Sequence, residues 1–256
     1  MTRTVGLIGT GNIGSAIARL AVAAGLDVVL SNSRGPESLS GLVEELGPRA
    51  RAASPREAAE AGDLVVLTIP LGVALAGLPA EVPAGRTVID TTVYYPYRDG
   101  RIEELEKGWP DEAPPTSSEL LQRRLPGAHL VKTFSNVDFH RLSLLARPAG
   151  APDRSALAVA GDDQGAKSRT IAFLDAIGYD AVDLGTLADS WRIGPNTPLH
   201  VQPYLGPRPQ NLTTHEERGT WFFQTPGVPV PAPRVRELIT EATPVPPGGP
   251  NPFSVS

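Results

Sequence analysis

The amino-acid sequence predicts an α/β protein whose core is a doubly wound parallel sheet. Short apolar runs alternate with segments of helical periodicity over residues 1–193, and this alternation is typical of strands joined by helical crossovers. The run at 64–70 is apolar almost throughout, as expected for a central parallel strand covered on both faces. A glycine-rich turn at 9–14 joins the first strand to the first helix.

This glycine turn indicates a dinucleotide site. The apolar strand at 5–8 leads into Gly9-Thr10-Gly11-Asn12-Ile13-Gly14, and a helix begins at once. Gly9 permits the tight turn, Gly11 lets the backbone approach phosphates, and Gly14 lets the helix pack closely on the strand. Backbone N–H groups at a helix N-terminus suit a pyrophosphate. With a second strand at 27–30, the pattern predicts a Rossmann fold; a purely structural glycine turn is the alternative.

The second strand ends without an acidic residue. An NAD site usually has Asp or Glu there, because a carboxylate binds the adenosine ribose hydroxyls and repels a 2′-phosphate. This chain has Ser31, Asn32, Ser33 and Arg34, all hydrogen-bond donors suited to a phosphate. We therefore expect NADP(H) rather than NAD(H); a polar loop with one solvated arginine is the alternative.

The remaining elements follow from local signals. Ser54 is expected to cap a helix that begins at Pro55, with Glu57 completing a capping box. Asp162 or Asp163 is expected to cap the helix that follows the strand at 156–160. Further helices are expected at 37–46, 73–78, 116–125 and 185–192, and further strands at 49–53, 87–92, 128–132 and 181–184.

Ligands bind at the carboxyl ends of the strands in open α/β sheets. Pro70 marks one such end, because proline cannot extend the ladder. Three tyrosines lie in a long loop that leaves the strand at 87–92; they could line a planar substrate or simply pack on the surface. Lys132 ends an otherwise apolar strand, where it is either a ligand-binding residue or a lysine that extends its head to solvent from the edge of the core.

The composition changes at Gly194. Fourteen of the 27 prolines follow this residue, and 235–241 is the one substantial helical pattern there. We expect a Rossmann domain at 1–193 and an irregular, proline-rich extension at 194–256. Such an extension cannot form its own core, so it is expected to pack on the domain or on a second subunit of a homodimer.

Composition excludes several function classes. The chain has no cysteine, so disulfides and thiolate chemistry are excluded. The formal net charge of −5 gives no general attraction for nucleic acid or an anionic membrane. The four histidines are scattered without ligand spacing, so no metal site is predicted. The start of the sequence shows no signal-like apolar segment, and we expect a cytoplasmic protein.

Several motifs together resemble a known family. The glycine turn, Ser33-Arg34, and the runs at 67–70, 131–134 and 160–163 occur in the order found in the deazaflavin (coenzyme F-420)-dependent NADP reductases. The resemblance covers about residues 4–193. It implies a Rossmann domain with NADP(H) lying across the strand ends.

The resemblance also implies roles for individual residues. Thr10, Ser33 and Arg34 would hold the 2′-phosphate, and Asn12 and Ile13 the pyrophosphate. Cofactor contacts are further expected from Asn32, Thr68, Ile69, Pro70 and Thr91, and contacts to a second planar reactant from Phe134, Ser135 and Asn136. The chain departs from well-known members of the family, which have histidine where Lys132 stands and proline where Ser135 stands. Those members also end in a compact helical segment, whereas the end of this chain is longer and broken by prolines.

The leading hypothesis is an NADPH-dependent oxidoreductase that transfers the C4 hydride of NADPH to deazaflavin coenzyme F-420. Stacking and orientation suffice for that acceptor. An alternative acceptor is a small carbonyl or imine, which needs a proton donor. Lys132 is the first candidate for this donor, followed by Tyr94 or Tyr95, and then by His140 and Asp189. A non-catalytic NADP-sensing or partner-binding protein is the alternative from another class.

Overall fold

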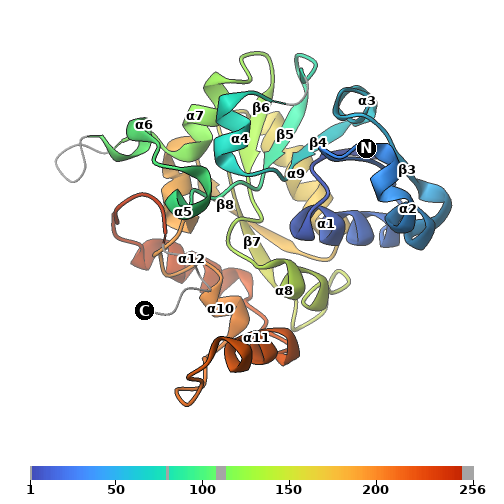
Figure 1. The fold of residues 1–256 in the computed structure, drawn as a ribbon. Helices are drawn as coiled ribbons and strands as arrows, with labels where there is room; N and C mark the ends of the chain where they lie inside the picture. The colour runs from blue at the N-terminus through green and yellow to red at the C-terminus, as the bar shows by residue number, and fades with distance from the viewer. Residues whose placement is uncertain (1, 79–80, 108–113, 250–256) are drawn as a thin grey trace.

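The computed structural model describes residues 2–78, 81–107 and 114–249. Within these ranges, eight strands form one sheet in the order β3-β2-β1-β4-β5-β6-β7-β8, and helices cover both of its faces (Figure 1). This arrangement confirms the predicted Rossmann-like α/β fold. The strands are β1 (Thr4–Ile8), β2 (Asp27–Ser31), β3 (Ala50–Ala52), β4 (Leu64–Leu67), β5 (Thr87–Asp90), β6 (His129–Lys132), β7 (Ala156–Gly161) and β8 (Asp180–Gly185).

The helices are mostly short. The α-helices are α1 (Asn12–Ala23), α2 (Ser40–Leu46), α3 (Pro55–Ala61), α4 (Leu71–Ala76), α5 (Pro96–Asp99), α6 (Glu103–Glu106), α7 (Ser117–Arg123), α8 (Phe139–Leu144), α9 (Gln164–Ala176), α10 (Gln202–Leu205), α11 (His215–Gln224) and α12 (Ala232–Glu241). Three 3₁₀ helices are η1 (Pro36–Leu39), η2 (Gly47–Arg49) and η3 (Leu187–Ile193). None of the helices within the described ranges is long and apolar enough to cross a membrane.

Strands β1 to β6 are all parallel to one another, so their carboxyl ends lie along one edge of the sheet. Every residue of β4 is buried, as expected for a central strand. Helix α1 buries Ala16, Ile17 and Ala21 against the sheet. Below, we call the edge where β1, β2, β4, β5 and β6 end the carboxyl edge.

The predicted parallel sheet has one antiparallel pair, at its far end. Strand β7 is antiparallel to β6, and β8 is parallel to β7. Only the last residues of β7 pair with β6, because Lys132 lies opposite Ala160 and Val131 opposite Gly161. The first part of β7 therefore extends beyond the carboxyl edge, where the C-terminal helices gather around it (Figure 1). The chain between β6 and β7 stays at the carboxyl edge. It does not return to the opposite edge of the sheet, as the crossover connection to a parallel strand would.

The C-terminal extension is more helical than predicted. Helix α12 contains the expected helix at 235–241, whereas α11 was missed. The extension is tied to β7, because Val230 O accepts a hydrogen bond from Ala156 N at 2.8 Å and the Tyr204 hydroxyl donates to Ala156 O at 2.7 Å. Helix α11 is held by the fully buried Arg141, whose guanidinium bonds Phe222 O and lies 4.3 Å from the Phe222 ring centroid.

Two other local expectations have clear outcomes. Ser54 and Glu57 form the predicted capping box, and Asp163 caps α9 through Ala166 N. The segment after β5, expected as a long loop, contains the short helices α5 and α6. Asp99 favours this local folding because its carboxylate accepts hydrogen bonds from Tyr95 N and Gly72 N.

Candidate functional site

The glycine turn between β1 and α1 has the geometry that its sequence predicts. Gly9 has φ +97°, and a Cβ there would lie 2.7 Å from Thr68 O. A Cβ at Gly14 would lie 2.4 Å from Gly9 O. At Gly11, by contrast, a Cβ would meet no atom within 4 Å. The fold therefore requires glycine at positions 9 and 14, whereas the space beside Gly11 is open.

The open space lies at the N-terminus of α1. Gly11 is the N-cap of this helix and no side chain caps it, so the first backbone N–H groups keep their hydrogen-bonding capacity. Asn12 begins the helix and is exposed, while Ile13 is half-buried against the core. An uncapped helix N-terminus beside open space is suited to an anion.

Two residues expected at the adenosine phosphate have structural partners instead. Ser31 is fully buried and its hydroxyl donates to Leu7 O at 2.7 Å, so Ser31 was wrongly included among the phosphate donors. The Thr10 hydroxyl donates to Ser31 O at 2.8 Å. Thr10 therefore fixes the glycine turn to the end of β2, and its one hydroxyl proton is already in use.

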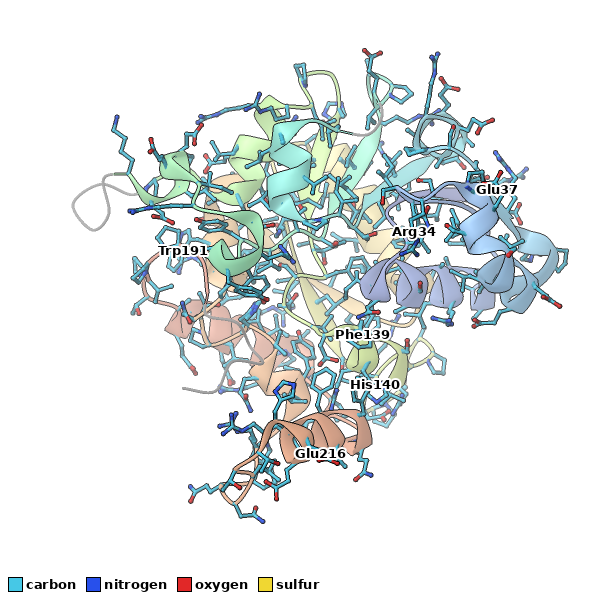
Figure 2. All side chains as sticks on the ribbon, in the orientation of Figure 1. Arg34, Glu37, Phe139, His140, Trp191 and Glu216 are labelled. Atoms are coloured by element: carbon cyan, nitrogen blue, oxygen red, sulfur yellow. The ribbon has the colours of Figure 1, made fainter. Side chains whose placement is uncertain are left out.

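The loop after β2 presents a free guanidinium. Asn32 shapes this loop, because its side-chain oxygen accepts from Arg34 N at 2.9 Å and its amide donates to Ser38 Oγ at 2.8 Å. Ser33 and Arg34 are exposed, and the Arg34 side chain has no ion pair within the described residues. Figure 2 shows Arg34 beside α1, far across the molecule from Trp191.

The predicted residues after β4 and β5 hold the carboxyl edge together. The Thr68 hydroxyl donates to Gly9 O, which joins the end of β4 to the glycine turn. The Thr91 hydroxyl donates to Leu67 O at 3.1 Å. Ile69 is half-buried and Pro70 is exposed. These residues line the route from the glycine turn towards β5.

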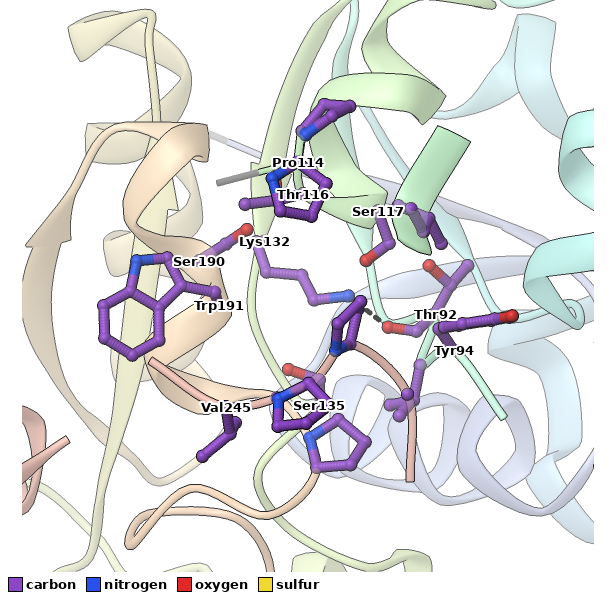
Figure 3. Close-up of a pocket in the computed structure, with 18 of the residues that line it drawn as sticks. Thr92, Tyr94, Pro114, Thr116, Ser117, Lys132, Ser135, Ser190, Trp191 and Val245 are labelled. Atoms are coloured by element: carbon purple, nitrogen blue, oxygen red, sulfur yellow. Dashed lines mark hydrogen bonds between the residues drawn. The ribbon is translucent and has the colours of Figure 1, made fainter. Parts of the chain in front are cut away.

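A cavity of about 170 Å³ lies at the ends of β5 and β6. Thr92, Lys132, Tyr94 and Trp191 surround it (Figure 3). Leu105 also lines the cavity. Residues 244–248, which we call the C-terminal strap, close one side together with residues 190–195 and 114–117. Most of these wall residues are proline or other apolar residues, so polar groups are confined to a few positions.

Lys132 belongs to a buried polar network and does not extend its head to solvent. Its ammonium lies 3.2 Å from Asp90 Oδ2. It also bonds Thr92 O, which Figure 3 marks with a dashed line. Asp90 is fully buried and accepts hydrogen bonds from Ser118 Oγ at 2.7 Å and Thr92 N at 2.7 Å. Burial lowers the pKa of Lys132, and the charge and hydrogen bond of the Asp90 carboxylate oppose this shift.

Two hydroxyl groups at the cavity have no hydrogen-bond partner within the described chain. Thr92 is 3% exposed and Ser135 is 5% exposed, and both residues line the cavity. Their Oγ1 and Oγ atoms are buried and unpaired. Such groups in a native structure usually have a partner supplied by water or a ligand. Of the predicted acceptor residues, Ser135 is therefore the one placed at the cavity.

The other two predicted acceptor residues face elsewhere. Phe134 is 1% exposed, has φ +63°, and packs edge-on against Phe173 with centroids 6.4 Å apart. The amide of the fully buried Asn136 donates to the Tyr204 hydroxyl at 2.9 Å. Neither residue lines the cavity: Phe134 belongs to the core and Asn136 anchors the extension.

Tyr94 lines the cavity with its ring, but its hydroxyl is occupied. It donates to Glu106 Oε1 at 2.6 Å and accepts from Ile102 N at 3.0 Å. Burial and the hydrogen bond to Glu106 raise the pKa of Tyr94 to about 12. Tyr94 therefore lines the cavity, while its hydroxyl proton is bonded to Glu106.

The remaining proton-donor candidates do not line the cavity. His140 bonds Phe223 O between α8 and α11, and Asp189 completes the capping box of η3. Tyr95 lies 3.2 Å from His200 Nε2, and Ile193 O lies 3.3 Å from His200 Nδ1. Because the carbonyl only accepts, Nδ1 carries the proton and Tyr95 donates to Nε2. Burial lowers the pKa of His200 to about 4.

Sequence reasoning missed Asp90, Ser118 and the strap. Asp90 ends the strand preceding the one that ends at Lys132, and parallel pairing places them opposite each other. An aspartate and a lysine at the ends of two adjacent parallel strands were therefore a signal for an ion pair. The strap gives no such signal, because its proline-rich sequence does not show which surface it covers.

Comparisons with known proteins agree with this geometry. Residues 4–94 match the model of a family described as "NADP oxidoreductase coenzyme F420-dependent". The "Putative protein YjhV" of Escherichia coli (strain K12) is 42% identical over 79 residues, which cover 31% of this chain and 54% of that protein. The chain thus spans about half the length of this curated relative.

Two solved structures resemble the chain over a greater length. The hypothetical protein SMa0349 from Sinorhizobium meliloti is 27% identical with a TM-score of 0.64, over 79% of this chain and 94% of that one. A structure described as "a putative f420 dependent nadp-reductase" from Arthrobacter sp. FB24 is 26% identical with a TM-score of 0.57, over 74% and 87%. The expected resemblance is confirmed: residues 4–94 match the family model, and a similar structure described as an F420-dependent NADP-reductase covers most of the chain.

Proposed function

We propose that the protein is an NADPH-dependent oxidoreductase that transfers a hydride between nicotinamide C4 and an acceptor in the cavity at the ends of β5 and β6. One arrangement carries this proposal: the uncapped α1 N-terminus, the free Arg34 and the Lys132 cavity all lie on the carboxyl edge. Neighbouring strands lie about 4.8 Å apart, so β5 is roughly 10 Å from β1. A dinucleotide that crosses β1 and β4 reaches the cavity from the glycine turn.

The chain's own residues bind and orient the cofactor in this proposal. The α1 N-terminus and the backbone at Gly11 bind the pyrophosphate, and Arg34 with Ser33 binds the 2′-phosphate. Thr68 and Thr91 keep the edge in place beside the nicotinamide ribose through their bonds to Gly9 O and Leu67 O. When bound, NADPH supplies the hydride.

A binding and turnover assay tests the proposal. NADPH and NADH are titrated against the protein by nicotinamide fluorescence, and NADPH oxidation is followed at saturating cofactor with deazaflavin, carbonyl and imine acceptors. We expect tighter binding of NADPH than of NADH, and turnover with one acceptor class. Absence of NADPH binding contradicts the proposal. Tight binding without turnover favours the non-catalytic NADP-sensing alternative.

Different observations support two acceptor classes. The match of residues 4–94 to the coenzyme F420-dependent family model and the 26% identity to the Arthrobacter protein support deazaflavin. The size and chemistry of the cavity support a small carbonyl or imine. Its volume is about 170 Å³, which is below the range of about 300–1,000 Å³ that is usual for drug-sized ligands.

Lys132 adds a second distinction between the two classes. Transfer to a stacked deazaflavin depends on ring orientation and needs no strong acid in the protein. Reduction of a carbonyl or imine requires a proton at the heteroatom, and the ammonium of Lys132 lines the cavity. Comparing Lys132→Met with the native protein on each acceptor separates the two classes, because only the second loses its proton donor.

A further inference from the structure

Donor groups in the cavity outnumber their acceptors. The Lys132 ammonium has three N–H bonds and uses two of them, on Asp90 Oδ2 and Thr92 O. The hydroxyl groups of Thr92 and Ser135 have no partner within the described residues. These three groups come from β6, the end of β5 and the turn after β6, so the backbone of two adjacent strands fixes their positions.

The charge of the site is balanced. Asp90 is fully buried and lies 3.2 Å from Lys132, so the pair is neutral as a unit. An anionic ligand would bring an uncompensated charge into this buried place, and a protonated imine would meet the Lys132 ammonium with a like charge. A neutral ligand oxygen that accepts hydrogen bonds meets neither penalty.

The walls restrict the rest of the ligand. Tyr94, Leu105 and Trp191 form apolar surfaces, and the C-terminal strap closes the cavity on one side. The strap is held by a hydrogen bond of 3.1 Å from Asn196 Nδ2 to Gly248 O. A small molecule with apolar substituents fits this enclosure better than a tricyclic ring that has a long polar side chain.

From these observations we infer that the hydride acceptor is a small, uncharged aldehyde or ketone whose carbonyl oxygen is bound by Lys132, Thr92 and Ser135. The inference rests on the proposed NADPH chemistry and names its substrate class. The C4–H bond of NADPH breaks, and its hydride forms a C–H bond at the carbonyl carbon, so NADPH is oxidised and the carbonyl is reduced. The oxygen takes a proton from Lys132 Nζ, which gives the alcohol, and Lys132 regains a proton from water after product release.

Asp90 acts as a positioning residue in this account. Its carboxylate binds the ammonium of Lys132 and is itself held by Ser118 Oγ and Thr92 N. The hydroxyl groups of Thr92 and Ser135 donate to the oxygen where negative charge develops during hydride transfer.

The test compares hydroxyl variants in and outside the cavity. NADPH oxidation is measured with short aliphatic aldehydes and ketones, with cyclic imines of similar size and with deazaflavin, for the native protein, Thr92→Val and Ser135→Ala. Thr170→Val is the control, because Thr170 on α9 also has a buried, unpaired hydroxyl but does not line the cavity. We expect the carbonyls to be the best acceptors, and kcat/KM to fall about 100-fold in each cavity variant and to stay unchanged in Thr170→Val.

The NADPH dissociation constant of each variant separates this inference from the proposed function. We expect the same constant in all four proteins, and deuterium from 4-deuterated NADPH in the product alcohol. Faster turnover of imines or deazaflavin, no carbonyl turnover, or unchanged carbonyl kinetics in Ser135→Ala would overturn the carbonyl assignment while NADPH binding remains. Loss of NADPH binding in the native protein would overturn the proposed function itself.

Discussion

The two ends of the carboxyl edge are built in different ways. At β1 and β2 the proposed binding groups come mainly from the backbone. Glycines, an uncapped helix and a loop shaped by Asn32 leave open space and exposed hydrogen-bond donors there. At β5 and β6 side chains dominate, with a buried Lys132–Asp90 pair enclosed by apolar walls. The first design suits a charged ligand that is also solvated, and the second suits a small ligand taken out of water.

This contrast coincides in part with the extent of the family match. Residues 4–94 contain β1 to β5 and match the family model, whereas Lys132, Ser135 and the strap lie beyond that range. The proposed cofactor residues therefore all lie inside the matched range, whereas the proposed acceptor residues include Thr92 inside it and Lys132 and Ser135 beyond it. Variants of one end should leave the other end's function in place.

Gly11→Ala is expected to have the largest effect at the cofactor end. A methyl group there meets no protein atom within 4 Å but occupies the space proposed for the pyrophosphate. Loss of two or more charge-assisted hydrogen bonds would weaken NADPH binding about 100-fold or more, while the thermal midpoint changes by only a few degrees. Fluorescence titration and calorimetry measure the two quantities.

Gly41→Ala is the matched control for this variant, because a Cβ at Gly41 on α2 also meets no atom within 4 Å. We expect native NADPH affinity in this control. Native affinity in Gly11→Ala as well would show that no phosphate approaches this turn.

Arg34→Glu is expected to change the cofactor preference. The substitution removes the exposed guanidinium and adds a charge that repels a 2′-phosphate, so NADPH affinity should fall by roughly 100-fold while NADH affinity is kept. Arg236→Glu, on the exposed face of α12, makes the same charge change away from the site and serves as the control. An unchanged ratio of NADPH to NADH affinity in Arg34→Glu would show that the 2′-phosphate does not bind at this loop.

The pH dependence of carbonyl reduction tests the acceptor end. Lys132 must be protonated to donate, so kcat/KM should fall by about tenfold per pH unit above its pKa. Because burial lowers the pKa of Lys132, with Asp90 opposing, this decline should begin below the usual range for lysine. The nearby His200 has a pKa of about 4 and stays neutral throughout the decline.

Lys132→Arg is the control, because it keeps the charge but does not titrate in this range. The activity of this variant should be lower and should not change with pH. A decline that persists in this variant would assign the titration to another group.

Asn196→Ala is expected to have the smallest effect. It removes the 3.1 Å hydrogen bond to Gly248 O, so the strap should close less firmly and the KM for the acceptor should rise about fivefold. NADPH affinity should stay native, because the strap is far along the edge from the glycine turn. Asn211→Ala, at an exposed position outside the cavity, is the control. An equal KM in both variants would show that the strap does not shape the acceptor site.

The sequence was a good guide where local rules determine the structure. The glycine turn, the capping box at Ser54 and the carboxyl edge follow from neighbouring residues and from the topology of parallel strands. It was a poor guide where side chains choose between distant partners. Ser31 has the same hydroxyl as Ser33, but Ser31 is buried and donates to Leu7 O. Phe134 has a positive φ and lies in the core.

The reversal of β7 and the helix α11 were missed for related reasons. An apolar strand such as β7 has the same pattern in either direction, because only tertiary pairing sets its orientation. Thr214 and Glu217 form a capping box at the start of α11, and this local signal could have predicted the helix despite the surrounding prolines.

A crystal structure of the protein with NADP⁺ and a small ketone tests the central claim most directly. The account predicts the 2′-phosphate on Arg34, the pyrophosphate at Gly11 and the nicotinamide at the mouth of the cavity, with the ketone oxygen on Lys132 Nζ and its carbon about 3–3.5 Å from C4. A nicotinamide ring directed away from Lys132, or a cofactor bound elsewhere than the carboxyl edge, would contradict it.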